Sequence, residues 1–139
     1  MELKTREGPL DVTVDINEFS TNSENLELRS VDIVFLFAVS GDQGSLNFAE
    51  LVYDSVKNVL RPETQKWLIL NQFSGPQGED KAAEFSKKYG FTLKRLSILA
   101  QPETVRNAFN NALVNLIIAR RPDLLPLTQP ACCGICHIF

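Results

Sequence analysis

The three cysteines and the only histidine of the chain lie in its final segment, ACCGICHIF (131–139). Cys132, Cys133, Cys136 and His137 are all possible zinc ligands. Adjacent ligands cannot readily reach one tetrahedron, however, and the sequence offers no second ligand cluster. A catalytic Cys–His pair would need an orienting shell of side chains, which a proline-rich tail does not supply. A tail without a chemical role, for example from a shifted reading frame, is a further alternative.

The last four residues favour a different chemistry, which is covalent lipid attachment. Cys136-His137-Ile138-Phe139 fits the C-a-a-X prenylation signal, although histidine at the second position is atypical. A terminal phenylalanine favours a geranylgeranyl group. One lipid chain anchors a protein only reversibly, so a second signal is expected. No polybasic run is present, and we therefore expect Cys132 and Cys133 to be palmitoylated beside a prenylated Cys136.

The composition is that of an ordinary globular domain. The chain has 139 residues, of which 44% are hydrophobic and 22% charged, with a net charge of -3. This charge and the absence of a basic run argue against nucleic-acid binding. The longest apolar run, Ile33 to Val39, is too short to cross a bilayer and indicates a buried strand. The first residues contain no apolar signal region, so we expect no secretion and reduced thiols.

Hydrophobic periodicity predicts a hairpin followed by three strand–helix units. Leu10 to Ile16 alternate between apolar and polar side chains, which predicts a half-buried strand after a turn at Arg6–Pro9. Next we expect a polar loop at 17–30, with or without one helical turn, and then a strand at 31–40 that is buried on both faces. A helix from a Ser45 cap through Leu60 and a strand at 67–71 follow. The last expected elements are a helix at 81–89 with Ala82, Ala83 and Phe85 inward and Gly90 at its end, a strand at 91–98, and a helix from Pro102 to about Arg120. Pro122, Pro126 and Pro130 then predict a linker. This alternation predicts an α/β fold whose mostly parallel sheet has helices on both faces.

The order of these elements, together with three loop sequences, resembles the Ras-like small GTPase superfamily from its second strand onward. LDVTVDINEF is similar to the third strand, with Asp15 in the position of the magnesium-linked aspartate. VDIVFLFAVSGDQGSLNF resembles the fourth strand and the start of the next helix. WLILNQFS resembles the fifth strand with its NKxD motif, in which Asn71 is retained. The resemblance implies a P-loop-GTPase-like (Rossmann-like) fold that is incomplete at the N-terminus.

The nucleotide-binding motifs of that family are damaged here. No GxxxxGK[ST] loop occurs, and Glu18 replaces the glycine whose amide contacts the terminal phosphate. Gln72 replaces the stacking lysine, and Ser74 replaces an aspartate that accepts two hydrogen bonds from guanine. Asp15 and Asn71 are therefore either relic nucleotide-binding residues or a strand-end aspartate and a loop-start asparagine that satisfy local backbone groups. We expect no catalytic residue, no metal site and no cofactor.

The family's first strand is central in its sheet, and its absence here would open a slot. Either the preceding strand closes directly on the next one, or a partner fills the slot, or the chain is a truncated product that folds poorly.

The leading functional hypothesis is a degenerate or truncated small GTPase-like signalling protein. It has a domain at 1–120 and a flexible lipid-anchor tail at 121–139, and it acts through protein–protein contacts on the cytoplasmic side of a membrane. Its expected partners are a prenyltransferase, that membrane face, and effector or regulator proteins, without nucleic acid. One alternative is a GTP-hydrolysing Ras- or Rho-type enzyme seen as an incomplete isoform, which would need GTP or GDP and Mg²⁺. Another is a soluble flavodoxin-like binding module.

Overall fold

The structure is a computed structural model that describes residues 2–5, 8–16, 25–73, 81–99 and 101–123. The chain forms two compact units. One comprises Met1–Glu18 and Asn111–Phe139, and the other comprises Phe19–Asn110.

A β-hairpin forms the N-terminal part of the first unit, as the sequence predicts. Strands β1 (Glu2–Thr5) and β2 (Gly8–Asp11) pair antiparallel in a two-stranded sheet. The prediction that the second strand continues to Ile16 is wrong. Asp11 lies opposite Glu2, the first described residue, so no described residue remains to pair with 12–16. Val14 and Ile16 are accordingly exposed.

The second unit is built on a three-stranded parallel sheet, which confirms the predicted α/β class. Strands β3 (Ile33–Val39), β4 (Gln65–Asn71) and β5 (Thr92–Leu96) lie in the order β3-β4-β5. This arrangement is compatible with a Rossmann-like fold. A short 3₁₀ helix, η1 (Asn25–Ser30), precedes β3 and corresponds to the helical turn considered for the loop at 17–30.

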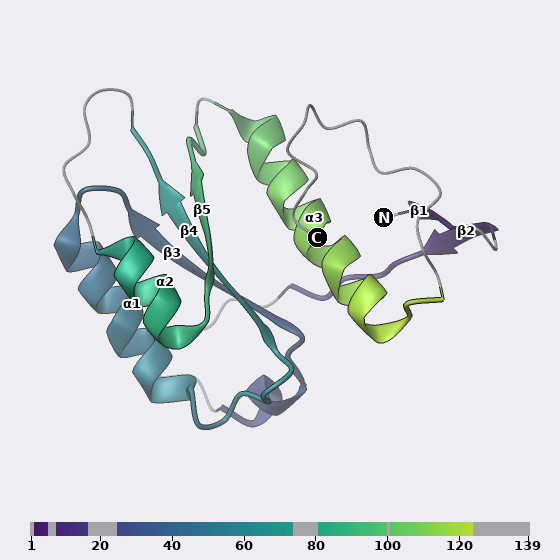
Figure 1. The fold of residues 1–139 in the computed structure, drawn as a ribbon, viewed down its shortest axis with the longest axis horizontal. Coiled ribbons are helices and arrows are strands. Elements are labelled where there is room, and N and C mark those ends of the chain that lie inside the picture. Colours follow the sequence, from purple (N-terminus) through teal and green to yellow (C-terminus); the bar gives the residue numbers. More distant parts are fainter. Residues whose placement is uncertain (1, 6–7, 17–24, 74–80, 100, 124–139) are drawn as a thin grey trace. The chain divides into compact units, whose positions relative to one another are not determined.

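Helices cover both faces of the parallel sheet (Figure 1). Helices α1 (Gln43–Val56) and α2 (Ala82–Tyr89) pack on one face. The core on this face consists of Leu36, Ala38, Leu46, Ala49, Tyr53, Val56, Leu68, Leu70, Ala82, Phe85 and Phe91. Helix α3 (Pro102–Arg120) begins on the opposite face, where the Phe109 ring lies 4.4 Å from the Phe35 ring, measured between centroids.

Two predictions about burial are wrong. Strand β3 is not buried on both faces along its whole length, because the Phe37 side chain is half exposed. In α2 the buried residues are Ala82, Phe85 and Ser86, whereas Ala83 is exposed. A helix of eight residues presents only a narrow buried stripe, and Ala83 lies outside it.

Local capping chemistry sets the ends of the helices. The N-cap of α1 is Asp42 rather than the predicted Ser45: the Asp42 carboxylate accepts hydrogen bonds from the amides of Gly44 (2.9 Å) and Ser45 (3.2 Å). The helix ends at Val56 rather than Leu60, because the carbonyl of Val56 accepts hydrogen bonds from both Val59 and Leu60 in a closing turn. Gly90, in the left-handed conformation (φ 72°), ends α2 as predicted.

Candidate functional site

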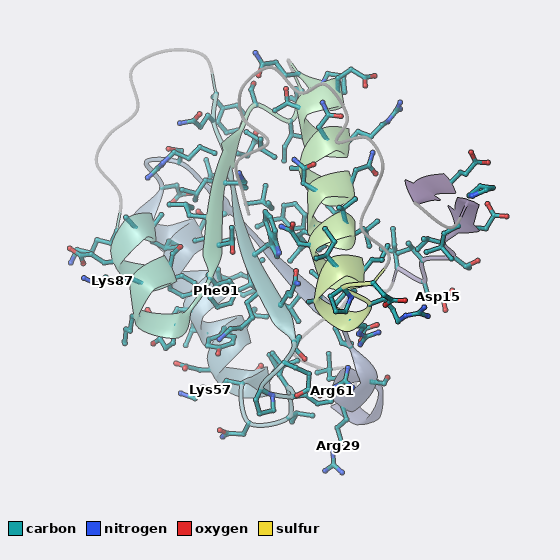
Figure 2. The ribbon with its side chains drawn as sticks, turned by 45° about the vertical axis from the view of Figure 1, so that its right-hand side comes forward. Asp15, Arg29, Lys57, Arg61, Lys87 and Phe91 are labelled. Atoms are coloured by element: carbon teal, nitrogen blue, oxygen red, sulfur yellow. The ribbon has the colours of Figure 1, made fainter. Side chains whose placement is uncertain are left out.

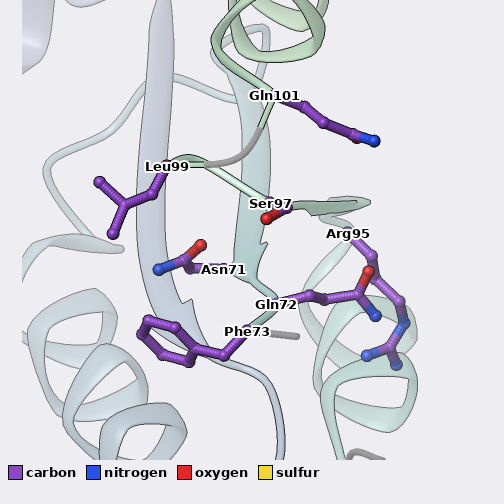
Figure 3. Close-up of a pocket in the computed structure, with 7 residues that line it drawn as sticks. All are labelled: Asn71, Gln72, Phe73, Arg95, Ser97, Leu99 and Gln101. Carbon is purple, nitrogen blue, oxygen red and sulfur yellow. The ribbon is translucent and has the colours of Figure 1, made fainter. Parts of the chain in front are cut away.

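The carboxyl ends of β4 and β5 form a cavity of about 430 Å³. The backbone at this edge is ordered by inter-strand bonds: the Gln72 amide donates to the Leu96 carbonyl (2.8 Å), and the Ser40 amide donates to the Asn71 carbonyl (2.9 Å). Ligands of open parallel sheets bind at this edge. The residues that line the cavity are Asn71, Gln72, Phe73, Arg95, Ser97, Leu99 and Gln101 (Figure 3).

Asn71, the last residue of β4, organises one wall of the cavity. Its side-chain Oδ1 accepts a hydrogen bond from the backbone amide of Ile98 at 3.1 Å. The side chain therefore joins the end of β4 to the turn that follows β5. This is the contact expected of a loop-start asparagine that satisfies local backbone groups, and it occupies an oxygen that a ligand would otherwise contact.

Arg95 supplies the charge of the cavity lining. Its Nη1 donates to the Oγ of Ser40, at the end of β3, over a distance of 3.4 Å. In the close-up, Arg95 and Gln72 extend toward one side of the cavity, and Asn71, Phe73 and Leu99 extend toward the other (Figure 3). The lining thus has a polar, cationic side and a side that carries exposed apolar groups.

The apolar side of the cavity opens to solvent. The Phe73 side chain is 52% exposed and the Leu99 side chain is 85% exposed. Single exposed apolar residues are normal on protein surfaces. Here, however, an aromatic ring, a leucine and an arginine share one concave site, and aromatic and arginine side chains are enriched at protein–protein interfaces.

The lining residues offer binding groups rather than catalytic groups. Among the described lining residues there is no carboxylate, thiol or imidazole, and Ser97 alone of them provides a hydroxyl. A serine nucleophile requires an adjacent base, and the described lining residues do not supply one. Throughout the described ranges, no group of three or more His, Cys, Asp or Glu side chains is placed to hold a metal ion.

The residues predicted from sequence belong to different parts of the chain. Asn71 lies in the cavity, whereas Asp15 lies in the other unit, exposed in the coil that follows β2 (Figure 2). Cys132, Cys133 and Cys136 fall outside the described residues, as do Glu18 and Ser74.

The sequence alone did not assign Phe73, Arg95, Leu99 or Gln101 to a site. Their positions at or just beyond the ends of adjacent parallel strands were the available signal.

A second polar cluster ties α1 to α2 near the amino end of the sheet. The Tyr89 hydroxyl donates to Glu50 Oε1, and this hydrogen bond lowers the pKa of the Glu50 carboxyl below its ordinary value. The Lys88 ammonium lies 3.3 Å from the same carboxylate oxygen. Lys66 donates to the Tyr53 hydroxyl (3.1 Å) and to the Tyr89 carbonyl. Each of these polar groups has a hydrogen-bond or ion-pair partner within the cluster. We therefore assign the cluster a role in holding α1, α2 and β4 together.

Comparison with known proteins adds no family to these observations. No protein-family model matches the chain, and no curated protein matches it either. Among the described helices, none combines the length and the apolar character needed to cross a bilayer.

Proposed function

We propose that this chain is a non-catalytic Ras-like α/β protein that is held on a cytoplasmic membrane face by a prenyl group and acts through protein–protein contacts. The fold supports the proposal through its three successive strand–helix units around a parallel sheet, with Asn71 at the carboxyl end of the second strand. From the sequence resemblance we further propose that the parallel sheet belongs to a P-loop-GTPase-like domain.

The observation that carries the proposal is the composition of the cavity at the carboxyl edge of the sheet. A guanine-binding site needs a carboxylate for the base and cationic or backbone donors for the phosphates. The described residues of the cavity lining include no carboxylate, and Asn71 Oδ1 is engaged by the Ile98 amide. The exposed Phe73 and Leu99, on the opposite side of the same cavity from Arg95, instead suit the side chains of a protein partner.

Titration of the purified chain with GTP and with GDP at millimolar Mg²⁺ tests the absence of nucleotide function. We expect no saturation at micromolar nucleotide, because the phosphate groups supply most of the affinity in nucleotide sites and no GxxxxGK[ST] loop is present. Micromolar affinity would contradict the proposal and favour the alternative of a GTP-binding enzyme.

The membrane part of the proposal rests on Cys136 and requires Phe139 to be the carboxyl terminus. In eukaryotic cells, the wild-type chain should sediment with membranes, and the Cys136→Ser variant should move to the soluble fraction. The double variant Cys132→Ser/Cys133→Ser keeps the prenyl acceptor, so it should bind membranes weakly, because one lipid chain gives only reversible attachment. A wild-type chain found wholly in the soluble fraction would exclude the anchor.

A further inference from the structure

We draw no further inference here: the strongest candidate, the surface patch formed by the exposed apolar side chains of Phe48 and Leu51 on α1, carries nothing because nothing in the structure shows what covers it.

Discussion

The Oδ1 atom of Asn71 accepts a hydrogen bond from the Ile98 amide at 3.1 Å, so the last residue of β4 holds the turn that follows β5. Asn71→Ala removes this acceptor and should lower the free energy of unfolding by about 1 kcal/mol. It should also accelerate hydrogen exchange at the Ile98 amide, as measured by NMR. Asn71→Asp keeps an acceptor oxygen and serves as the control. Unchanged exchange at Ile98 in the alanine variant would contradict the role assigned to this side chain.

The N-terminus of α1 depends on the Asp42 carboxylate, which accepts hydrogen bonds from the Gly44 and Ser45 amides. Replacing an N-cap carboxylate by alanine costs about 1 kcal/mol, so Asp42→Ala should lower the denaturant midpoint correspondingly. Asp42→Asn retains an oxygen acceptor and should cost much less. If the two variants lose the same stability in urea denaturation, the capping assignment is wrong.

Ser86 is buried in α2, and its Oγ has no hydrogen-bond partner among the described residues. A buried hydroxyl without a partner is destabilising, so Ser86→Ala should raise the free energy of unfolding by about 1 kcal/mol. Part of any gain comes from the higher helix propensity of alanine. Ser55→Ala on the exposed side of α1 measures that part, although it also removes a bond to the Val52 carbonyl. The Ser86 account fails if Ser86→Ala stabilises the protein no more than Ser55→Ala does.

The Glu50 carboxylate should make the free energy of unfolding depend on pH in the acid range. The hydrogen bond from Tyr89, followed by the nearby Lys88, holds the pKa of Glu50 below the ordinary value of 4.5. A carboxyl whose pKa is lower in the folded state contributes stability that is fully present above the unfolded pKa and is lost as the pH falls through the folded pKa. The difference in unfolding free energy between wild type and Glu50→Gln should therefore be constant well above pH 4.5 and shrink below it.

Tyr89→Phe removes the main cause of the shift and should bring the Glu50 pKa, followed by NMR, closer to 4.5. The Glu50 carboxylate is partly exposed, so the effect on stability should be small in either variant. A Glu50 pKa that does not move in the Tyr89→Phe variant would contradict this explanation.

The elements that the sequence predicts best are those defined by local chemistry. The continuous apolar run of β3, the Pro102 start of α3 and the Gly90 stop of α2 each depend on a few neighbouring residues. The strand predicted through Ile16 fails, because a strand also needs a partner and alternation alone does not supply one. The N-cap of α1 is misplaced by three residues, since Asp42 and Ser45 are both capping residue types and only the geometry distinguishes them.

The candidate site is less predictable than the fold, because its residues come from separate loops. Asn71 is identified by its motif position, but its partner Ile98 becomes apparent only when β4 and β5 lie side by side. Arg95 belongs to a strand and would be taken for a solvent-facing residue, yet it reaches Ser40 at the end of β3. Phe37 shares a sheet face with Phe35, yet Phe35 packs on Phe109 of α3 whereas Phe37 is half exposed; how far the helix covers that face is a property of tertiary structure.

The intact mass of the chain isolated from eukaryotic cells tests the central claim, a lipid-anchored protein, most directly. In the Ras-like superfamily that the chain resembles, prenylation is followed by removal of the last three residues and methylation of the new terminus. We therefore predict a mass that corresponds to loss of His137-Ile138-Phe139 and addition of one prenyl group with a terminal methyl group, and Cys136→Ser should abolish this change. Palmitoyl groups on Cys132 and Cys133 should appear as further increments that thioester cleavage removes. An unmodified mass of the full 139-residue chain would contradict the account.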